Sequence, residues 1–153
     1  MRYFLVVLLF VFPAFAQPVS ETGLPLPRFV SLKGDEAYMR NGPGKRYPVK
    51  WKYTRKGLPV KIINEYQHWR KVEDHEGVKG WMHKSVLSGR RTAILRHDAI
   101  IMRDKPNEAA DGIAKLMKEV IVEVDHCRQD WCEVAVGRKD GWLPVSLLWG
   151  GKL

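Results

Sequence analysis

Two short stretches, Trp69-Arg70-Lys71-Val72 and Trp131-Cys132-Glu133-Val134, decide how this chain is organised. Both place Trp three residues before Val, and they lie 62 residues apart. At the same offset, the apolar residues of 58–62 coincide with those of 120–124. Further matches drift by one residue, as loop insertions produce: Gly80-Trp81 with Gly141-Trp142, Met39-Arg40 with Met102-Arg103, and Pro43 with Pro106. Because apolar positions agree while polar positions differ, the pattern predicts a duplicated unit with a shared core.

Each copy consists of short runs in which apolar and polar residues alternate. Leu58-Pro59-Val60-Lys61-Ile62 is such a run, and its period of two is typical of a strand with one buried face. About five strands in about 60 residues predict a small closed barrel, because closure removes exposed sheet edges. We therefore expect an all-β fold of two tandem small β-barrels, spanning 29–88 and 92–150. The window Gly112–Val122 has near-helical apolar spacing, but the duplication predicts strand there.

Four tryptophans recur at equivalent places in the two copies. A domain of about 60 residues buries only about 60% of its unfolded surface, so large rings help to complete its core. We interpret these four as core or partly buried residues: Trp69, Trp81, Trp131 and Trp142.

The first 16 residues have the order of a secretory signal peptide. Arg2 precedes an apolar run, Tyr3–Phe12, and Ala14-Phe15-Ala16 provides small residues before a cleavage site. A membrane anchor is the alternative, but a spanning helix needs about 20 apolar residues and this run is about half that length. We predict cleavage after Ala16, a flexible leader over 17–28, and a periplasmic or secreted product without a membrane span.

The formal net charge is +9, and a basic surface attracts nucleic acid, membranes or acidic polymers. Basic residues interleaved with aromatic ones also occur in proteins that bind single-stranded nucleic acid. Export argues against that class, so no nucleic-acid partner is expected. We expect the partner to be peptidoglycan or another component of the cell envelope.

The two cysteines, Cys127 and Cys132, are predicted to form a disulfide, since an exported chain with an even cysteine count favours one. A metal site is the weaker alternative, because adjacent His126 leaves the set without a fourth ligand or zinc spacing. The four residues between the cysteines suit a hairpin loop. At the repeat offset the first copy has Glu65 and Arg70, and we predict an exposed ion pair there.

Several motifs of the first copy carry a resemblance to a known family. They are Ala37-Tyr38-Met39-Arg40-Asn41-Gly42-Pro43-Gly44, Tyr47-Pro48-Val49, Lys56-Gly57, Trp69-Arg70-Lys71-Val72 and Gly80-Trp81-Met82-His83. With these motifs the copy is similar to a bacterial SH3-like (SH3b) domain, and the whole chain is similar to a two-copy exported group of such domains. The second copy departs from the family pattern at Lys105-Pro106-Asn107, where a Gly-Pro-Gly turn is usual. The resemblance implies two SH3-like barrels that recognise peptides or cell-wall peptidoglycan.

No set of residues in the sequence suggests catalysis. The five histidines are scattered, and no nucleophile motif, phosphate loop or metal-ligand spacing is present. His75 lies in Glu73-Asp74-His75-Glu76, which we interpret as a solvated hairpin tip. We expect no enzyme activity, no cofactor and no metal.

Binding is the expected function, and aromatic residues outside the predicted core mark a candidate groove in the first copy. SH3-type barrels hold extended chains in aromatic-lined grooves. The alternative for Trp51 and Tyr53 is packing against the second copy. We predict a non-catalytic module that binds peptidoglycan or a peptide, with a structural or adaptor role toward another envelope protein as the alternative. The candidate groove residues are Tyr38, Tyr47, Trp51, Tyr53, Arg46 and Lys50.

Overall fold

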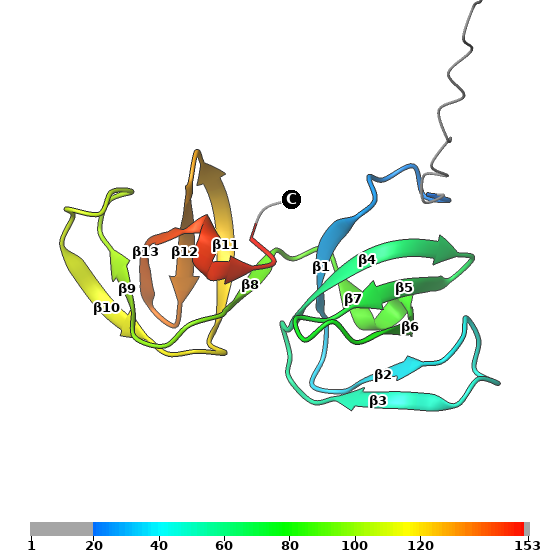
Figure 1. Ribbon diagram of the computed structural model, residues 1–153. Coiled ribbons are helices and arrows are strands. Elements are labelled where there is room, and N and C mark those ends of the chain that lie inside the picture. The colour runs from blue at the N-terminus through cyan, green and yellow to red at the C-terminus, as the bar shows by residue number, and fades with distance from the viewer. Residues whose placement is uncertain (1–19, 152–153) are drawn as a thin grey trace, which may run out of the picture.

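Figure 1 shows the computed structural model, which describes residues 20–151; the predicted signal peptide lies outside them. The described chain is all-β, as the alternation predicts, and folds into two seven-stranded antiparallel sheets, each curled into a small barrel. No helix within 20–151 is long and apolar enough to cross a membrane.

The first sheet has the spatial order β3-β2-β6-β5-β4-β1-β7. A short 3₁₀ turn, η1 (Lys84–Val86), leads into the last strand. The strands are β1 (Arg28–Leu32), β2 (Ala37–Arg40), β3 (Val49–Tyr53), β4 (Pro59–Tyr66), β5 (Trp69–Glu73), β6 (Lys79–His83) and β7 (Leu87–Ser88).

The second sheet has the order β10-β9-β13-β12-β11-β8-β14, which repeats the first strand for strand. It also ends with a 3₁₀ turn, η2 (Val145–Leu147). Each sheet has seven strands rather than about five, because strands of two to four residues are too short to show a period. The strands are β8 (Thr92–Leu95), β9 (Ile100–Arg103), β10 (Gly112–Leu116), β11 (Ile121–Arg128), β12 (Trp131–Val136), β13 (Lys139–Pro144) and β14 (Leu148–Trp149).

The duplicated motifs form equivalent parts of the two cores. Met39 and Met102 are fully buried, each over a glycine of the neighbouring strand. A Cβ at Gly80 would lie 2.3 Å from Met39 Cγ, and one at Gly141 would lie 2.7 Å from Met102 Cγ. Both copies have glycine before this tryptophan because the methionine side chain occupies the space that a Cβ would need.

The tryptophans and the ambiguous window behave as the repeat predicts. Trp142 is buried and the other three repeated tryptophans are half-buried. The window Gly112–Val122 forms β10, a turn and the start of β11 instead of a helix. The equivalence of this window to strands of the first copy predicts its secondary structure better than its local apolar spacing does.

Cys127 and Cys132 are paired across β11 and β12 and form the predicted disulfide. The loop between the strands is shorter than expected. Both strands continue past the cysteines, so that only Gln129 and Asp130 form the turn.

Glu65 and Arg70 are opposite each other across β4 and β5, at the register positions of the two cysteines. Their atoms Arg70 Nε and Glu65 Oε1 lie 3.6 Å apart. The predicted pair therefore exists, but the expectation that it is exposed is wrong: the side chains are 0% and 8% accessible. Arg28 adds a second ion pair to Glu65 at 2.7 Å and covers it from β1.

The predicted leader contributes to the same buried site. Residues 20–27 are attached to the first barrel, because the Thr22 N–H and hydroxyl both donate to the Glu65 carboxylate, at 2.9 Å each. Burial alone would raise the pKa of Glu65, but the donors Thr22 and Arg28 outweigh it and lower the pKa to about 2. A buried carboxylate needs donors, and the polar composition of the leader supplies them.

The two barrels lie side by side and share an apolar interface (Figure 1). Ile94 and Trp149 of the second barrel are buried as part of the first barrel's core cluster. The Trp149 ring meets Phe29 edge to face, with centroids 4.8 Å apart. The Thr92 hydroxyl donates to the Gly57 carbonyl at 2.6 Å. These residues, rather than Trp51 and Tyr53, join the two copies.

Candidate functional site

The six predicted groove residues do not form one surface. Arg46 and Tyr47 lie in the β2–β3 connection, whereas Tyr38 and Lys50 lie on the two strands themselves. Tyr53 is buried. The structure therefore separates residues that the sequence grouped into one groove.

Arg46 and Tyr47 form the tip of the β2–β3 hairpin. The Arg46 guanidinium carbon lies 5.1 Å from the Tyr47 ring centroid, a cation–π contact. Arg40 Nη1 donates to the Tyr47 carbonyl at 2.9 Å and to the Lys45 carbonyl at 3.2 Å, so the tip is fastened to β2. The tip thus presents an aromatic ring and two cations, Lys45 and Arg46, in a fixed arrangement.

Three aromatic side chains that the candidate groove omitted lie where β4 ends, β5 begins and β6 ends, near η1. The Trp69 and His83 rings meet edge to face with centroids 5.4 Å apart, and His68 lies 6.1 Å from His83. Exposed Tyr66 adds a fourth ring at the end of β4. Figure 1 places the β4–β5 turn and the β2–β3 connection at the same end of the first barrel, away from the second barrel.

His83 links the hairpin tip to the ring cluster, because Lys45 of the tip and His68 of the cluster both affect its pKa. Burial is the main cause that lowers its pKa, and the nearby basic side chains of His68 and Lys45 lower it further. Its Nδ1 accepts a hydrogen bond from the Ser85 N–H at 3.2 Å and caps η1. We name this surface the basic aromatic end: Lys45, Arg46, Tyr47, Tyr66, His68, Trp69 and His83.

The second barrel has a cavity at the equivalent end with a different charge. The register pairs Trp69 with His83 in the first barrel and Trp131 with Pro144 in the second. The β2–β3 hairpin and its equivalent are offset by 63 residues, as Met39 and Met102 are, so Glu108 takes the place of Lys45. At the offset of 62, Asp130 takes the place of His68. The cavity has a volume of about 590 Å³ and is lined by Glu108, Asp130, Trp131, Pro144, Val145 and Ser146. One copy thus presents cations beside the shared tryptophan, and the other presents carboxylates.

Tyr38 and Lys50 lie elsewhere and already have partners. The Tyr38 hydroxyl donates to Glu36, and Lys52 Nζ is 5.7 Å from the Tyr38 ring and 2.8 Å from the Glu36 carboxylate. Lys50 Nζ donates to the Lys79 carbonyl at 2.9 Å. These side chains fasten the hairpin to its neighbours and leave Tyr38 40% exposed on the outer face.

Tyr53 belongs to the core, so its placement outside it was wrong. It pairs with Ala37 at the inward face of the sheet, and its hydroxyl donates to Asp74 Oδ2 at 2.7 Å. Burial and this bond raise the pKa of Tyr53. Trp51, two residues earlier, faces the same side, but β3 is an edge strand, and the Trp51 ring is 52% exposed. Trp51 lines a cleft that is described below.

The sequence pattern predicts a core or partly buried position for Trp69 and assigns no role to His68 or His83, so most of the basic aromatic end was not predicted. A usable signal was present. His83 follows Gly80-Trp81-Met82, and its strand is expected to pair with that of Trp69. Residues at the shared end of paired strands lie close together, and this argument finds the cluster.

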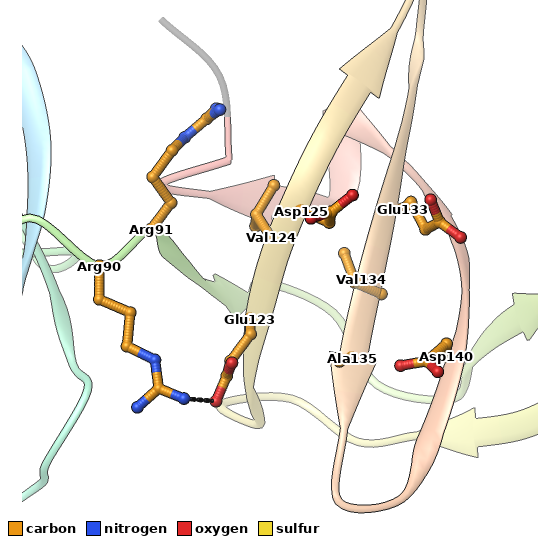
Figure 2. A pocket seen from close by; sticks show the side chains of 9 residues that line it. All are labelled: Arg90, Arg91, Glu123, Val124, Asp125, Glu133, Val134, Ala135 and Asp140. Carbon is orange, nitrogen blue, oxygen red and sulfur yellow. Dashed lines mark hydrogen bonds and ion pairs between the residues drawn. The ribbon is translucent and has the colours of Figure 1, made fainter.

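Another cavity, of about 340 Å³, lies on the outer face of β11, β12 and β13 beside Arg90 and Arg91, which join the two barrels (Figure 2). Four carboxylates and two arginines line it, and Figure 2 shows Arg90 paired with Glu123. Next to it, ligand atoms of Asp125, His126 and Glu133 lie within 4.8 Å of one another. His126 Nδ1 already contacts both carboxylates, at 2.8 and 3.3 Å, so these groups satisfy one another.

The comparisons with known proteins agree with the fold. The profile of the bacterial SH3 domain family matches the chain twice, over residues 33–89 and 97–150. No curated protein matches the chain. The two matched segments correspond to the two barrels and contain the tryptophan pairs that shape both barrel ends. The chain belongs to the bacterial SH3 domain family, in two tandem copies.

Proposed function

We propose that this chain is an exported, non-catalytic binding module that recognises cell-wall peptidoglycan through the basic aromatic end of its first barrel. Bacterial SH3 domains are binding modules, often for peptidoglycan or peptides. The observation that carries the proposal is that the Arg46–Tyr47 tip and the Trp69–His83 pair lie at the same end of the first barrel, where Lys45 of the tip lowers the pKa of His83.

The chemistry of this end suits a carboxylate-bearing wall peptide. Lys45 and Arg46 supply positive charge, and Arg can bind a carboxylate through two parallel hydrogen bonds. Tyr47, Tyr66 and Trp69 supply rigid rings for the apolar parts of an extended chain.

Export is part of the same proposal. The predicted signal peptide over 1–16 lies outside the described residues, but the Cys127–Cys132 disulfide favours an oxidising compartment. A periplasmic or secreted location would bring the chain into contact with the wall. Mass spectrometry of the exported product tests the cleavage after Ala16.

Co-sedimentation with purified sacculi tests wall binding. The full chain is expressed with its residues 1–16, purified from the exported fraction and mixed with sacculi. The double variant Lys45→Glu/Arg46→Glu is expected to weaken binding about tenfold, since two exposed charge contacts are reversed.

The matched control is Arg138→Glu/Lys139→Glu, an adjacent basic pair at a turn of the second barrel, which should leave binding unchanged. Circular dichroism checks that every variant is folded. Wall binding is refuted if wild type stays in the supernatant, or if both double variants lose binding equally.

An adaptor role toward another envelope protein is the second candidate, and the acidic cavity at Trp131 favours it. A wall ligand that suits Lys45 does not suit Glu108 at the equivalent place. Cross-linking in intact cells separates the two, because an adaptor yields a single protein adduct that depends on Glu108 and Asp130.

A further inference from the structure

The junction between the barrels contains two adjoining cavities built by both copies. One, of about 230 Å³, extends from Trp51 past Arg55, and the other, of about 310 Å³, extends toward Arg96 and His97. Three residues line both: His75 and Glu76 from the β5–β6 turn, and Glu119 from the β10–β11 turn. The two cavities therefore form one cleft that requires both barrels, and clefts between domains are common ligand sites. We name it the junction cleft.

His75 gives the cleft an unsatisfied polar atom. The sequence predicted a solvated hairpin tip, but Asp74 is buried and accepts from the Tyr53 hydroxyl and from two backbone N–H groups of its own turn. The His75 ring lies 6.3 Å from Trp149 of the second barrel. Its Nδ1 is buried and has no partner among residues 20–151. Buried polar atoms are normally hydrogen-bonded, so a residue that lines both cavities carries an atom whose hydrogen bond is not made within the described part of the chain.

Glu119, which lines the cleft, has a backbone conformation that glycine adopts more readily than other residues do. Its φ is +67°, in the left-handed region, and at the repeat offset the first copy has Gly57 with φ +77°. The Glu119 N–H donates to Leu95 at 2.9 Å, and its carbonyl accepts from Arg55 Nη2 at 2.7 Å, so the conformation is fixed. Glycine would adopt it without strain. The second copy has Glu instead, and its side chain lines both cavities.

The charges around the cleft alternate in sign. The carboxylates of Glu76 and Glu119 form no ion pair within the described part of the chain. Arg55 lies on one side of them, and Arg96 and Lys118 lie on the other. A ligand that carries only one sign of charge would meet repulsion from one of these groups. A ligand with an ammonium and a carboxylate on the same carbon meets both.

We propose that the junction cleft binds the free amino-acid end of a diamino acid in a wall peptide. This inference rests on the proposed function for the source of the ligand. The ammonium lies between Glu76 and Glu119, the carboxylate lies toward Arg96 and Lys118, His75 Nδ1 bonds a polar atom of the head group, and the aliphatic stem lies toward Trp51.

The probe for the test is meso-diaminopimelate, titrated into the full exported chain by calorimetry and by NMR of the tryptophan indole N–H signals. A ligand of this size is expected to bind with a dissociation constant of about 1 mM. The Trp51 indole signal should move. The diacetylated probe lacks both ammonium groups, and 1,5-diaminopentane lacks both carboxylates, so neither should bind.

Two variants of Glu119 separate ligand binding from folding. Glu119→Gly removes the carboxylate and the strain, so it should bind the probe at least about tenfold more weakly while its melting temperature rises. Glu119→Gln keeps the strained residue and should weaken binding by a similar factor. Asp111→Asn, at an exposed carboxylate of the second barrel, is the matched control and should bind as wild type does.

The proposal is overturned if wild type shows no binding at about ten times the expected dissociation constant, or if both Glu119 variants bind like wild type. The sacculus assay keeps the two proposals apart. Sedimentation with sacculi without probe binding leaves the proposed function standing and refutes the junction site. Probe binding without sedimentation supports the site and refutes its assignment to the wall.

Discussion

Phe29 and Trp149 meet edge to face across the boundary between the two barrels, with ring centroids 4.8 Å apart. Trp149 comes from the last strand of the second barrel, yet it is 9% exposed and belongs to the first barrel's core cluster. The second barrel therefore completes the core of the first. The two copies are expected to unfold as one cooperative unit rather than separately.

The first prediction follows from this shared core. Trp149→Ala should cost about 3–5 kcal/mol of unfolding free energy and should split one urea transition into two. Trp51→Ala is the control, because a ring that is half in solvent should cost no more than about 0.5 kcal/mol. A Trp149 variant with a single transition and wild-type stability would show that the barrels fold independently.

The duplication was predictable because matched cores need matched apolar residues. Met39 with Gly80 and Met102 with Gly141 pack alike, and matches within one residue of the offset of 62 already paired them. The opposition of Glu65 and Arg70 followed from the same offset, since equivalent residues occupy equivalent register positions.

The burial of Glu65 was not predictable from the offset. It depends on Arg28 and Thr22, which are more than 35 residues away in sequence and approach only through the fold. The packing of Trp149 was not predictable either. Its neighbours in sequence suggest a place in the core of its own barrel, and no local pattern indicates that it packs against Phe29 of the first barrel.

The candidate groove was only partly predictable for a geometric reason. Trp51 and Tyr53 are two residues apart on β3 and point to the same side, as their spacing predicts. The barrel covers the end of β3 that carries Tyr53 and leaves Trp51 at the edge. Which part of an edge strand is covered depends on its neighbours, and periodicity does not report that.

The second prediction concerns the disulfide. Replacing both Cys127 and Cys132 by Ala should lower the free energy of unfolding by about 2 kcal/mol, the value expected for a short closed loop. Thermal denaturation with and without a reducing agent measures it. Reduction should lower the melting temperature of wild type and leave the double variant unchanged. Equal melting temperatures for reduced and oxidised wild type would contradict the expectation.

The third prediction tests the geometry of the basic aromatic end. Lys45 is one of the cations that lower the pKa of His83, so Lys45→Gln should raise that pKa toward its ordinary value. NMR titration of the His83 ring protons measures it. Lys139→Gln removes a lysine of the second barrel and should not change the His83 titration. An unaltered His83 pKa in the Lys45 variant would place the hairpin tip away from β6.

The fourth prediction concerns acid stability. The pKa of Glu65 is about 2 in the folded chain, and an unfolded glutamate has a pKa of about 4.3. Between these values the unfolded chain binds more protons than the native one, so the contribution of Glu65 is complete above pH 4.3 and is lost as the pH falls toward about 2.

Glu65→Gln should therefore be less stable than wild type by about 1.5–3 kcal/mol at neutral pH, because charge-assisted hydrogen bonds to Arg28 and Thr22 are lost. Urea denaturation at several pH values should show this difference shrinking as the pH is lowered from about 5 to about 2. Glu108→Gln, at an exposed carboxylate, should show only a small difference at every pH. A Glu65 difference that is the same at all pH values would mean that the carboxylate is not selectively ionised by its donors in the folded state.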